Sequence, residues 1–239
     1  MKYLDLTLPT PEENLAADEA LLELCESGGE DEVLRFWESS QPFVVLGYSN
    51  RAAVEVYLDA ARRAGVPVLR RCTGGGAVVQ GPGCLNYTLV LRIEKAAQLG
   101  GVAETNRYIL QRHRDALAPL LGGTVAVRGI SDLATGELKI SGNAQRRKKH
   151  CVLFHGTFLL DFDIELVERL LPLPSREPDY RRRRPHREFL TNAALLRPVV
   201  KSALARTWRA GEVLTSFPMD LVQRLARERY GTEQWTYKF

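Results

Sequence analysis

The sequence predicts an α+β domain with a mixed or antiparallel sheet, and three observations lead to this fold class. Short segments rich in β-branched and aromatic residues are interspersed with amphipathic helical segments along the chain. Several strand segments follow one another closely enough to form hairpins, which argues against a purely parallel sheet. The length of 239 residues suits one large domain, or one domain with a small appendage, and can bury a sizeable core.

The first third of the chain is expected to supply strands around one capped helix. A short strand is predicted over residues 2–7, and a helix follows from Thr10 onwards. Thr10 can cap this helix, Pro11 suits its first turn, and Glu13 stands three residues after the cap. The next expected elements are strands in EVLRFWES and PFVVLGYS and a helix in VEVYLDAARRAG that ends at Gly65.

The glycine-rich centre of the chain lies between two predicted strands. PVLRRCT precedes it and LNYTLVLRI follows it, and we expect these strands to pair antiparallel, with the glycines as turn and rim. The remaining expected elements, in order, are the helix ETNRYILQRHRDALAPLLGG, two short strands around a loop in TVAVRGISDLATGELKISGNAQ, the strand HCVLFHGTFLLDF, the helix IELVERLL, an irregular stretch rich in proline and arginine, and two closing helices in RPVVKSALARTWRAG and PMDLVQRLARERYG.

Charge and cysteine content narrow the class of protein only slightly. The net charge of +4 is a mild basic bias that fits nucleic acid, a nucleotide or an acidic protein partner and selects none of them. The four cysteines, Cys25, Cys72, Cys84 and Cys151, include no C-x-x-C pair and are too sparse for a secreted disulfide scaffold. There is no signal-peptide pattern and no apolar run of about 20 residues, so we expect a cytoplasmic protein without a membrane partner.

The stretch RRCTGGGAVVQGPGC concentrates glycines between two strands, where glycine weakens regular structure. It matches neither the G-x-x-x-x-G-K-[ST] phosphate loop nor a G-x-G-x-x-G turn that opens a helix. Glycines at such a place let a ligand approach the backbone and expose N–H groups to it. A sheet bulge or flexible hairpin is the simpler interpretation of the glycines alone. Arg70 and Arg71 favour a ligand, because arginine offers a fork of donors for phosphate or carboxylate.

A second cluster, SDLATGELKISGNAQ, places Lys139 in a strand beside glycines. A lysine held there can supply a fixed positive charge at a reaction centre. From residue type and position alone, however, a solvated strand lysine is the better interpretation of Lys139. The case for function therefore rests on the two clusters in combination.

Together, RRCTGGGAVVQGPGCLNYT, SDL, KISGNAQ and HGTFLL resemble, in order and spacing, the catalytic domain of the lipoate–protein ligase A family in the biotin/lipoate ligase superfamily. The resemblance extends to NLAADEAL near the N-terminus, to LGYSN, and to TNAALL before the closing helices, so it covers nearly the whole chain. The combination of RR-x-[ST]-GGGAV with K-[IV]-SG-[NS]-A is specific, whereas either pattern alone is much weaker evidence.

The resemblance implies a mixed, largely antiparallel sheet flanked by helices. It implies a catalytic domain over residues 1–190, and we expect a helical extension over residues 191–239 that packs on the same domain. Many ligases carry a separate accessory domain after the catalytic one, and here this chain is expected to depart from the family and to have none. The implied activity is that of a ligase using ATP and Mg²⁺, which converts lipoate or octanoate to acyl-AMP and transfers the acyl group to a lysine. The implied partners are lipoyl acceptor domains of 2-oxoacid dehydrogenases or the glycine cleavage H protein, with a separate accessory protein as an open alternative.

The resemblance also assigns roles to individual residues. Lys139 would bridge the acyl carbonyl and α-phosphate oxygens as negative charge develops there, and Asp132 would lie near the nucleotide and Mg²⁺. Arg70 and Arg71 would face the phosphate end of the site. The other residues implied to bind the acyl-adenylate are Thr73, Gly74, Gly75, Gly76, Ala77, Gly142 and Ala144.

The sequence departs from the ligase pattern and so leaves a second enzyme class open. Gln80 and Cys84 stand where the ligases usually carry histidine and asparagine, and many ligases carry Arg-Asn where this chain has Ile-Ser before the aspartate of SDL. Related octanoyl- and lipoyl-transferases need no ATP and hold the acyl group on a cysteine, for which Cys84 is the first candidate and Cys72 the second. The transferase cysteines would fall near Ile130 or Gln145, where this chain has none, so a small apolar loop residue is the preferred interpretation of Cys84.

Two histidines and two basic runs have simpler interpretations than catalysis or nucleic-acid binding. His155 is interpreted as a hydrogen-bonded structural histidine at a strand turn, and His113 as a surface residue of a basic helix. The basic runs at 146–149 and 181–184 are typical of solvated loops. A basic nucleic-acid-binding module is the alternative of a different class, but no aromatic residues interleave the runs and no recognition motif accompanies them. The runs could instead steer an acidic acceptor domain towards the site.

Overall fold

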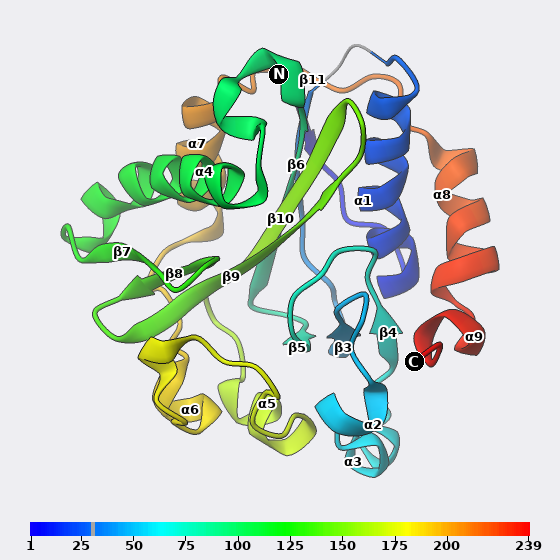
Figure 1. The fold of residues 1–239 in the computed structure, drawn as a ribbon, viewed down its shortest axis with the longest axis vertical. Coiled ribbons are helices and arrows are strands. Elements are labelled where there is room, and N and C mark those ends of the chain that lie inside the picture. The colour runs from blue at the N-terminus through cyan, green and yellow to red at the C-terminus, as the bar shows by residue number, and fades with distance from the viewer. Residues whose placement is uncertain (30–31) are drawn as a thin grey trace.

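The computed structural model describes residues 1–29 and 32–239 and shows a mixed sheet with helices on both faces (Figure 1). In this part of the chain, eight strands form the large sheet, in the spatial order β11 (Glu212–Val213), β1 (Lys2–Asp5), β2 (Val33–Trp37), β6 (Cys84–Arg92), β10 (Cys151–Leu159), β9 (Leu138–Arg147), β8 (Asp132–Thr135) and β7 (Val125–Arg128). A small second sheet has the order β4 (Val68–Arg70), β3 (Phe43–Leu46) and β5 (Val78–Gln80). In the large sheet, β1 pairs parallel with β2 and β11, and the other neighbours are antiparallel. The predicted α+β class and largely antiparallel mixed sheet are confirmed.

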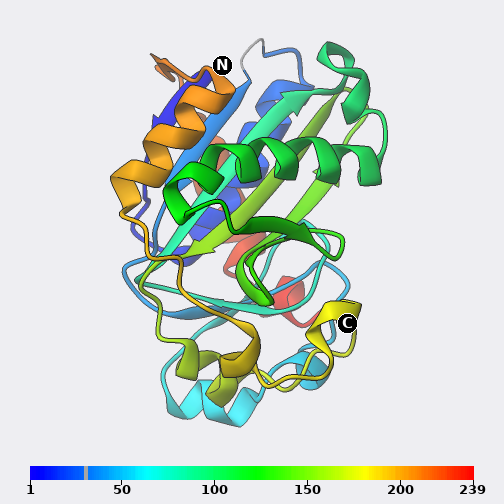
Figure 2. The same ribbon diagram turned by 90° about the vertical axis from the view of Figure 1, so that its left-hand side faces the viewer.

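The described residues form nine α-helices around the two sheets. They are α1 (Pro11–Glu26), α2 (Ala52–Glu55), α3 (Leu58–Arg63), α4 (Val102–Leu117), α5 (Ile164–Leu170), α6 (His186–Phe189), α7 (Arg197–Trp208), α8 (Met219–Leu225) and α9 (Glu233–Thr236), with short 3-10 segments at Ile93–Lys95, Ala97–Leu99, Ala118–Leu121 and Asp179–Arg181 and a π turn at Ala226–Tyr230. α1 and α8 cover one face, whereas α4 and α7 lie across the other, as the turned view shows (Figure 2). None of these helices is long and apolar enough to cross a bilayer.

Strand β2 shows how the sheet separates two cores. Leu34 and Phe36 point into the core shared with α4 and α7, while Val33 and Trp37 point into the core shared with α1 and α8. This follows from the alternation of side chains along a strand. Arg35 lies between Val33 and Trp37 on the α1 face and is fully buried, which makes it an unusual residue for a core strand.

Helix α1 begins as the sequence predicts. The Thr10 hydroxyl accepts a hydrogen bond from the Glu13 N–H at 3.2 Å, and the Glu13 carboxylate accepts one from the Thr10 N–H at 3.1 Å. This reciprocal capping satisfies two donors that the first turn of a helix leaves without partners. The helix then buries two carboxylates, Asp18 and Glu19, against the sheet.

The predicted pairing of the two strands around the glycines is wrong. β4 pairs parallel with β3 in the small sheet, whereas β6 lies in the large sheet between β2 and β10. The stretch between β4 and β6 is therefore a crossing from one sheet to the other, and it contains β5, which pairs with β3. Periodicity identified each strand, but it carries no information about which sheet a strand joins.

Two further expectations differ from the structure. The helix predicted to end at Gly65 is broken into α2 and α3, because Val56 and Tyr57 are non-helical and the Tyr57 N–H donates to the Leu170 carbonyl oxygen. His113 is buried in the α4 core, not on the surface, and its Nε2 accepts from Trp208 Nε1 at 2.8 Å. Burial lowers the pKa of His113 to about 3, so it is a neutral core residue.

The segment after residue 190 is joined to the rest of the fold through two elements that were not predicted. The short strand β11 pairs with β1 at the edge of the large sheet, and α9 lies beside β4. α8 packs on α1. The residues after 190 are thus divided, because α7 lies on the α4 face, β11 extends the sheet, and α8 and α9 lie on the α1 side.

Candidate active site

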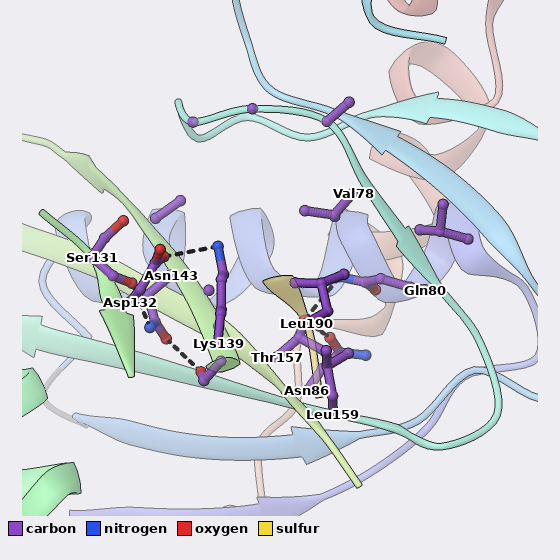
Figure 3. Close-up of a pocket in the computed structure, with 18 of the residues that line it drawn as sticks. Val78, Gln80, Asn86, Ser131, Asp132, Lys139, Asn143, Thr157, Leu159 and Leu190 are labelled. Carbon is purple, nitrogen blue, oxygen red and sulfur yellow. Dashed lines mark hydrogen bonds and ion pairs between the residues drawn. The ribbon is translucent and has the colours of Figure 1, made fainter. Parts of the chain in front are cut away.

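A cavity of about 210 Å³ lies between the large sheet and residues 73–77, which we call the glycine-rich loop. Its floor is a row of residues paired in register across four strands: Trp37, Asn86, Thr157 and Gly142. Directly paired residues point to the same face of a sheet, so this row forms one continuous surface. Figure 3 shows Lys139 and Asp132 towards one end of the cavity and Gln80 and Asn86 towards the other.

The cavity is mainly apolar, with a few polar groups at the end away from Lys139. The apolar lining comes from α1, β5, β10 and α5 and the segments next to them: Leu15, Val79, Leu159, Phe162, Val167, Leu171 and Leu190. At the polar end, Gln80 Nε2 donates to Thr157 Oγ1 at 3.1 Å, and Thr157 Oγ1 donates to Asn86 Oδ1 at 2.5 Å. Such a lining suits a mostly hydrocarbon ligand whose orientation is fixed by a few polar contacts.

Lys139 lies at the mouth of the cavity, where a carboxylate holds its ammonium group. Its Nζ lies 2.8 Å from Asp132 Oδ1, and Tyr180 donates its hydroxyl to Asp132 Oδ2 at 2.8 Å. A Cβ at Gly142 would lie 2.7 Å from Lys139 Nζ, so glycine is the residue that leaves room for this ammonium. The ammonium therefore occupies a defined position with part of its surface still open.

A second, wider groove of about 1140 Å³ opens on the other side of Lys139. It shares Gly75, Gly76, Asp132 and Lys139 with the cavity, so the two spaces meet at the lysine. The rest of its lining mixes apolar residues such as Val54 and Ile130 with polar ones, among them the arginines Arg51, Arg128 and Arg176. Within the described chain, Arg128 Nε is buried without a hydrogen-bond partner, and no group of three or more His, Cys, Asp or Glu side chains could hold a metal ion.

Arg71 holds the glycine-rich loop from inside. Its Nη2 donates to the carbonyl oxygens of Gly74 and Gly76 at 2.5 and 2.9 Å, and burial lowers the pKa of the guanidinium to about 10. A peptide N–H points away from the carbonyl that precedes it, so the N–H groups of Gly75 and Ala77 face away from Arg71. Neither of these two groups has a hydrogen-bond partner among residues 1–29 and 32–239. The loop thus presents backbone donors of the kind that bind anions.

Two positions at this loop require glycine, one for its backbone conformation and one for close packing. Gly75 has a φ of +88°, and a Cβ there would lie 2.7 Å from Arg71 Nη2. Gly47, in the LGYSN segment, packs so closely that its Cβ would overlap the Gly75 carbonyl oxygen. The Gly47 N–H donates to Asn50 Oδ1 at 2.7 Å, which fixes this neighbouring turn.

Arg70 lies outside both spaces, unlike Arg71. It is fully buried, and its guanidinium donates to the backbone carbonyl oxygens of Gly47, Tyr48, Asn50, Trp235 and Thr236 at 2.6 to 3.0 Å. Arg70 therefore ties the LGYSN turn to the C-terminal helix α9 and does not face the phosphate end of the site. The two adjacent arginines have the same sequence signal, but strand alternation sends them in different directions.

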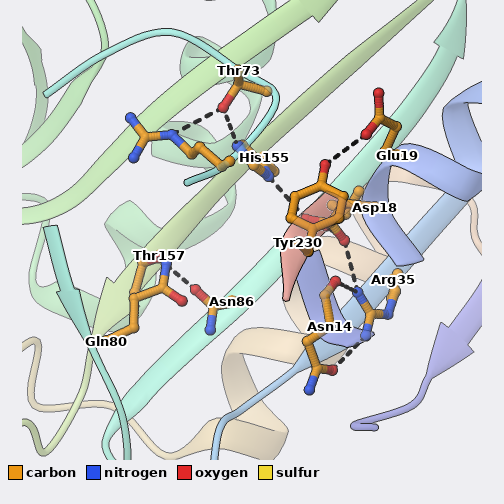
Figure 4. Close-up of polar contacts among 12 residues, drawn as sticks. Asn14, Asp18, Glu19, Arg35, Thr73, Gln80, Asn86, His155, Thr157 and Tyr230 are labelled. Atoms are coloured by element: carbon orange, nitrogen blue, oxygen red, sulfur yellow. Dashed lines mark hydrogen bonds and ion pairs between the residues drawn. The ribbon is translucent and has the colours of Figure 1, made fainter. Parts of the chain in front are cut away.

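Behind the loop, a chain of polar side chains leads to α1 (Figure 4). Thr73 Oγ1 lies 2.9 Å from Arg71 Nε and 2.8 Å from His155 Nε2, and His155 Nδ1 lies 2.9 Å from Asp18 Oδ2. Asp18 also pairs with the buried Arg35 at 2.7 Å. His155 is hydrogen-bonded as expected, but it lies within β10 and lines the cavity instead of marking a strand turn.

The structure thus brings together most of the predicted site residues and adds others. Lys139, Asp132, Gly142 and Ala144 line the cavity with Arg71 and the loop residues Gly75, Gly76 and Ala77. Thr73 and Gly74 are the first two residues of the loop and do not line the cavity or the groove. The Gly74 carbonyl oxygen instead accepts a hydrogen bond from Arg71. The residues that the sequence did not indicate are Asp18, Trp37, Asn86 and Tyr180. The NLAADEAL match contained a signal for Asp18, whereas nothing in the sequence marked Tyr180 in its irregular segment.

None of the four cysteines lines the cavity or the groove in the described part of the chain. Cys84 is fully buried in the apolar cluster below β5, and burial raises the pKa of its thiol. Burial likewise raises the pKa of Cys72 to about 11. Cys25 and Cys151 form a disulfide between α1 and β10, a pairing that the sequence did not predict. A reactive cysteine needs an accessible, stabilised thiolate, and neither free cysteine has one.

The two basic runs are largely occupied by contacts within the chain. Arg146 pairs with Glu19 at 2.8 Å, and Lys148 pairs with Glu23. Arg147 donates to Thr105 Oγ1 at 3.1 Å. In the second run, Arg181 and Arg184 hold their own loop, while residues 182 and 183 are exposed in a left-handed conformation. The first run therefore belongs to strand β9 and its neighbours and is not a solvated loop.

Comparison with known proteins gives a consistent result across most of the chain. Residues 10–203 match the family model for the lipoyl protein ligase A/B catalytic domain. The octanoyltransferase LipM of Symbiobacterium thermophilum is 32% identical over 96% of this chain and 95% of that protein. The lipoate-protein ligase A subunit 1 of Thermoplasma acidophilum is 28% identical over 93% of this chain and 90% of that protein.

Solved structures agree in fold along the full length. The structure of a bi-partite lipoate protein ligase and its E2 lipoyl domain from Thermoplasma acidophilum has a TM-score of 0.82 at 25% identity, covering 99% of this chain and 95% of that one. A lipoate-protein ligase A bound with ATP has a TM-score of 0.80 at 27% identity, covering 99% of both chains.

Proposed function

The chain belongs to the lipoyl protein ligase A/B catalytic-domain family, and from this membership we propose that it is an ATP-dependent lipoate–protein ligase. In the proposed reaction it converts lipoate or octanoate to acyl-AMP and transfers the acyl group to a lysine of an acceptor domain. The observation that carries the proposal is that an apolar cavity and an arginine-lined groove meet at Lys139 and Asp132.

The cavity would hold the acyl chain with its carboxylate towards Lys139. Gly142 and Asn86 lie two strands apart on the cavity floor. Neighbouring strands are about 4.8 Å apart, so these positions are separated by about 10 Å, roughly the length of an extended eight-carbon chain. The chain would thus lie across the strands, from the ammonium to the polar group around Gln80.

The chemistry would take place where cavity and groove meet. A carboxylate oxygen attacks the α-phosphorus of ATP, the bond to the β-phosphate oxygen breaks, and pyrophosphate leaves. The neutral acceptor lysine amine then attacks the acyl carbonyl carbon, AMP leaves, and the amine loses a proton. Both steps develop negative charge on oxygen, which Lys139 Nζ and the N–H groups of Gly75 and Ala77 are positioned to stabilise.

The groove would take the nucleotide, and its residues fit that role. Arg51, Arg128 and Arg176 suit phosphate oxygens, and the partnerless Arg128 Nε is a donor that a ligand oxygen would satisfy. Asp132 is the carboxylate nearest to this point, and both of its oxygens already accept hydrogen bonds. Mg²⁺ commonly takes one protein carboxylate together with phosphates and water, so Asp132 would be a partial ligand through its remaining lone pairs.

An ATP-independent octanoyltransferase is the second candidate, favoured by the name of the LipM relative. That route, in its thioester form, needs a cysteine that can accept the acyl group. Cys84 and Cys72 are both buried, and neither borders the cavity. This observation supports the ligase over the thioester route.

One assay separates the two candidates. The protein is incubated with Mg²⁺, ATP and lipoate or octanoate, and pyrophosphate release is measured with and without a lipoyl acceptor domain. We expect pyrophosphate release that depends on the fatty acid. Octanoyl transfer from an acylated carrier protein to the acceptor without ATP, seen by intact-protein mass spectrometry, would instead establish the transferase.

The acceptor is proposed to be a lipoyl domain of a 2-oxoacid dehydrogenase or the glycine cleavage H protein. The Thermoplasma acidophilum structure pairs a bi-partite ligase with its E2 lipoyl domain, and its similarity to this chain supports an acceptor of that kind. Mass spectrometry of either acceptor after incubation should show a mass gain of one acyl group on a single lysine. If pyrophosphate is released but no acceptor gains mass, the second half-reaction needs a separate accessory protein.

A further inference from the structure

We infer that Asp18, His155 and Thr73 form a relay that sets the shape of the glycine-rich loop through Arg71. The relay joins α1, β10 and the segment after β4 (Figure 4). These three are positioning residues, because they act on the loop and not on the reacting atoms. The inference rests on the proposed function, since the loop is assigned there to the acyl and phosphate groups.

The relay starts from a fixed negative charge. Asp18 Oδ1 accepts from Arg35 Nη1 and from Thr88 Oγ1, both at 2.7 Å, and the carboxylate is buried. Burial raises the pKa of Asp18, but the hydrogen bond to His155 and the charge of Arg35 outweigh it, so the net pKa is below the ordinary value. An ionised carboxylate can only accept hydrogen bonds, so His155 Nδ1 must be the donor.

This assignment fixes the direction of the remaining bonds. Arg71 Nε is always a donor, so Thr73 Oγ1 accepts from it at 2.9 Å. The Thr73 hydroxyl proton is then available for His155 Nε2 at 2.8 Å, which a neutral imidazole accepts. Every donor and acceptor in the chain from Arg71 to Asp18 is satisfied in this arrangement, and the hydroxyl of Thr73 is the link that no other group replaces.

Arg71 connects the relay to the loop. The guanidinium is planar, so the bond at Nε fixes the orientation of Nη2, which holds the carbonyl oxygens of Gly74 and Gly76. Those carbonyls determine where the N–H groups of Gly75 and Ala77 point. Without the Thr73 hydroxyl, the guanidinium keeps only carbonyl acceptors, those of Gly74 and Gly76 in the loop itself and that of Val45 at 3.4 Å, so we expect it to hold the loop donors less firmly.

The residue Thr88 provides a matched control for Thr73. Both are fully buried threonines, and both hydroxyls belong to the hydrogen-bond network of Asp18. The Thr88 hydroxyl donates directly to the Asp18 carboxylate and is not part of the path of hydrogen bonds to the loop. Thr73→Val and Thr88→Val therefore remove the same chemical group from the same network, on opposite sides of His155.

We measure kcat and KM for acyl-adenylate formation in Thr73→Val, Thr73→Ser and Thr88→Val. Thr73→Val should lower kcat on the order of tenfold to a hundredfold, because misplaced donors lose the reacting geometry, while the KM for octanoate changes less than about threefold. Thr73→Ser should recover most of kcat, and Thr88→Val should retain it. Equal losses of kcat in the two valine variants, or no recovery in Thr73→Ser, would overturn the inference. If Thr73→Val does not fold, Thr73→Ala takes its place.

A second readout does not depend on activity. In ¹⁵N NMR of the full chain, the buried Nε–H of Arg71 should exchange with water at least about tenfold faster in Thr73→Val and at the wild-type rate in Thr88→Val. If the wild type forms no acyl-AMP while Arg71 responds in this way, the proposed function fails and the relay stands. If the Arg71 signal is unchanged in Thr73→Val, the relay fails whatever the activity.

Discussion

The glycine-rich loop and the strand that carries Lys139 face the same point, where cavity and groove meet, but they are held there in different ways. The loop is fixed from behind by buried groups, since Arg71 and Thr73 are nearly or fully inaccessible and bond to one another and to the loop carbonyls. Lys139 is fixed from the side by one carboxylate, and its side chain remains 23% exposed.

The two regions therefore contribute different properties to the site, the loop its backbone geometry and Lys139 its charge. The positive charge of Arg71 is directed into its own loop, so the loop contributes backbone geometry and N–H groups. Lys139 shares its ammonium with Asp132 alone among the charged groups of the described chain, so it contributes charge to the open space. An arginine next to a glycine-rich loop is therefore not necessarily the anion-binding charge, and here a lysine some 70 residues away in sequence is in the position to supply it.

The largest effect is expected on the Lys139 side. Lys139→Ala should lower acyl-adenylate formation on the order of 10²-fold or more, because a fixed charge at a developing oxyanion is worth several kcal/mol. The midpoint of thermal unfolding should change little, since the side chain is partly exposed. The exposed Lys149→Ala is the matched control and should keep wild-type rates in a pyrophosphate-release assay. Near-normal activity in Lys139→Ala would remove it from the centre of the mechanism.

On the loop side, Gly75→Ala should weaken octanoate binding about tenfold or more and slow the reaction. The new Cβ would lie 2.7 Å from Arg71 Nη2, and the φ of +88° is unfavourable for alanine. Gly74→Ala is the control, because its Cβ would meet nothing within 4 Å and its φ is not in the left-handed region. Calorimetry with octanoate measures both affinities. Equal affinities for the two folded variants would show that the loop is merely a turn.

The buried groups on the loop side should also make the stability of the protein depend on acidic pH. The folded-state pKa of Asp18 is lowered, so its stabilisation is present above the unfolded pKa of about 3.8 and is lost as the pH falls towards the folded value. Asp18→Asn leaves Arg35 buried without its countercharge, which should cost about 3–5 kcal/mol at neutral pH. Thermal unfolding from pH 7 to pH 3 should show this cost shrinking below about pH 5. The exposed Asp115→Asn should show no such trend, and a cost of Asp18→Asn that is independent of pH would contradict the assignment.

The smallest effect on activity is expected at Cys84. Cys84→Ser should keep acyl transfer within about twofold of wild type, because the thiol lies in the core below β5 and does not border the cavity. Its unfolding free energy should fall by about 1–2 kcal/mol, because a hydroxyl replaces a thiol in an apolar cluster. A hydroxylamine-labile octanoyl adduct on Cys84, detected by mass spectrometry, would reverse the choice between ligase and transferase.

Local chemistry made the elements of this fold predictable. The cap of α1 depends on Thr10, Pro11 and Glu13, which are close in sequence, and the structure confirms it. The glycine pattern and Lys139 pointed to one site, and the structure places both beside the same cavity. The cap is a signal contained within a few residues, whereas the assignment of Lys139 to a site came from the family resemblance, since residue type and position alone favoured a solvated strand lysine.

Contacts between distant segments were not predictable in the same way. Arg70 and Arg71 are indistinguishable as sequence, and the structural role of Arg70 depends on carbonyl groups of the LGYSN turn and of α9, the latter some 165 residues further on. His113 looked exposed in a basic helix, but Trp208 packs over it and donates to its ring. Cys25 and Cys151 are 126 residues apart, and their pairing depends on how α1 lies against β10. In each case the deciding partner comes from another layer of the fold.

The carbonyl groups that hold Arg70 also have a consequence for the order of events during synthesis. Trp235 and Thr236 are translated some 165 residues after Arg70, and they hold the guanidinium that also holds the LGYSN turn against the glycine-rich loop. A nascent chain that has released 230 residues can already have formed most of its sheet pairings, but it lacks this closing contact. Domains fold largely as units while the ribosome adds about 5–20 residues per second. The loop should therefore reach its final form only after α9 has been synthesised, so that a chain stalled before this helix carries a folded sheet with an unfinished site.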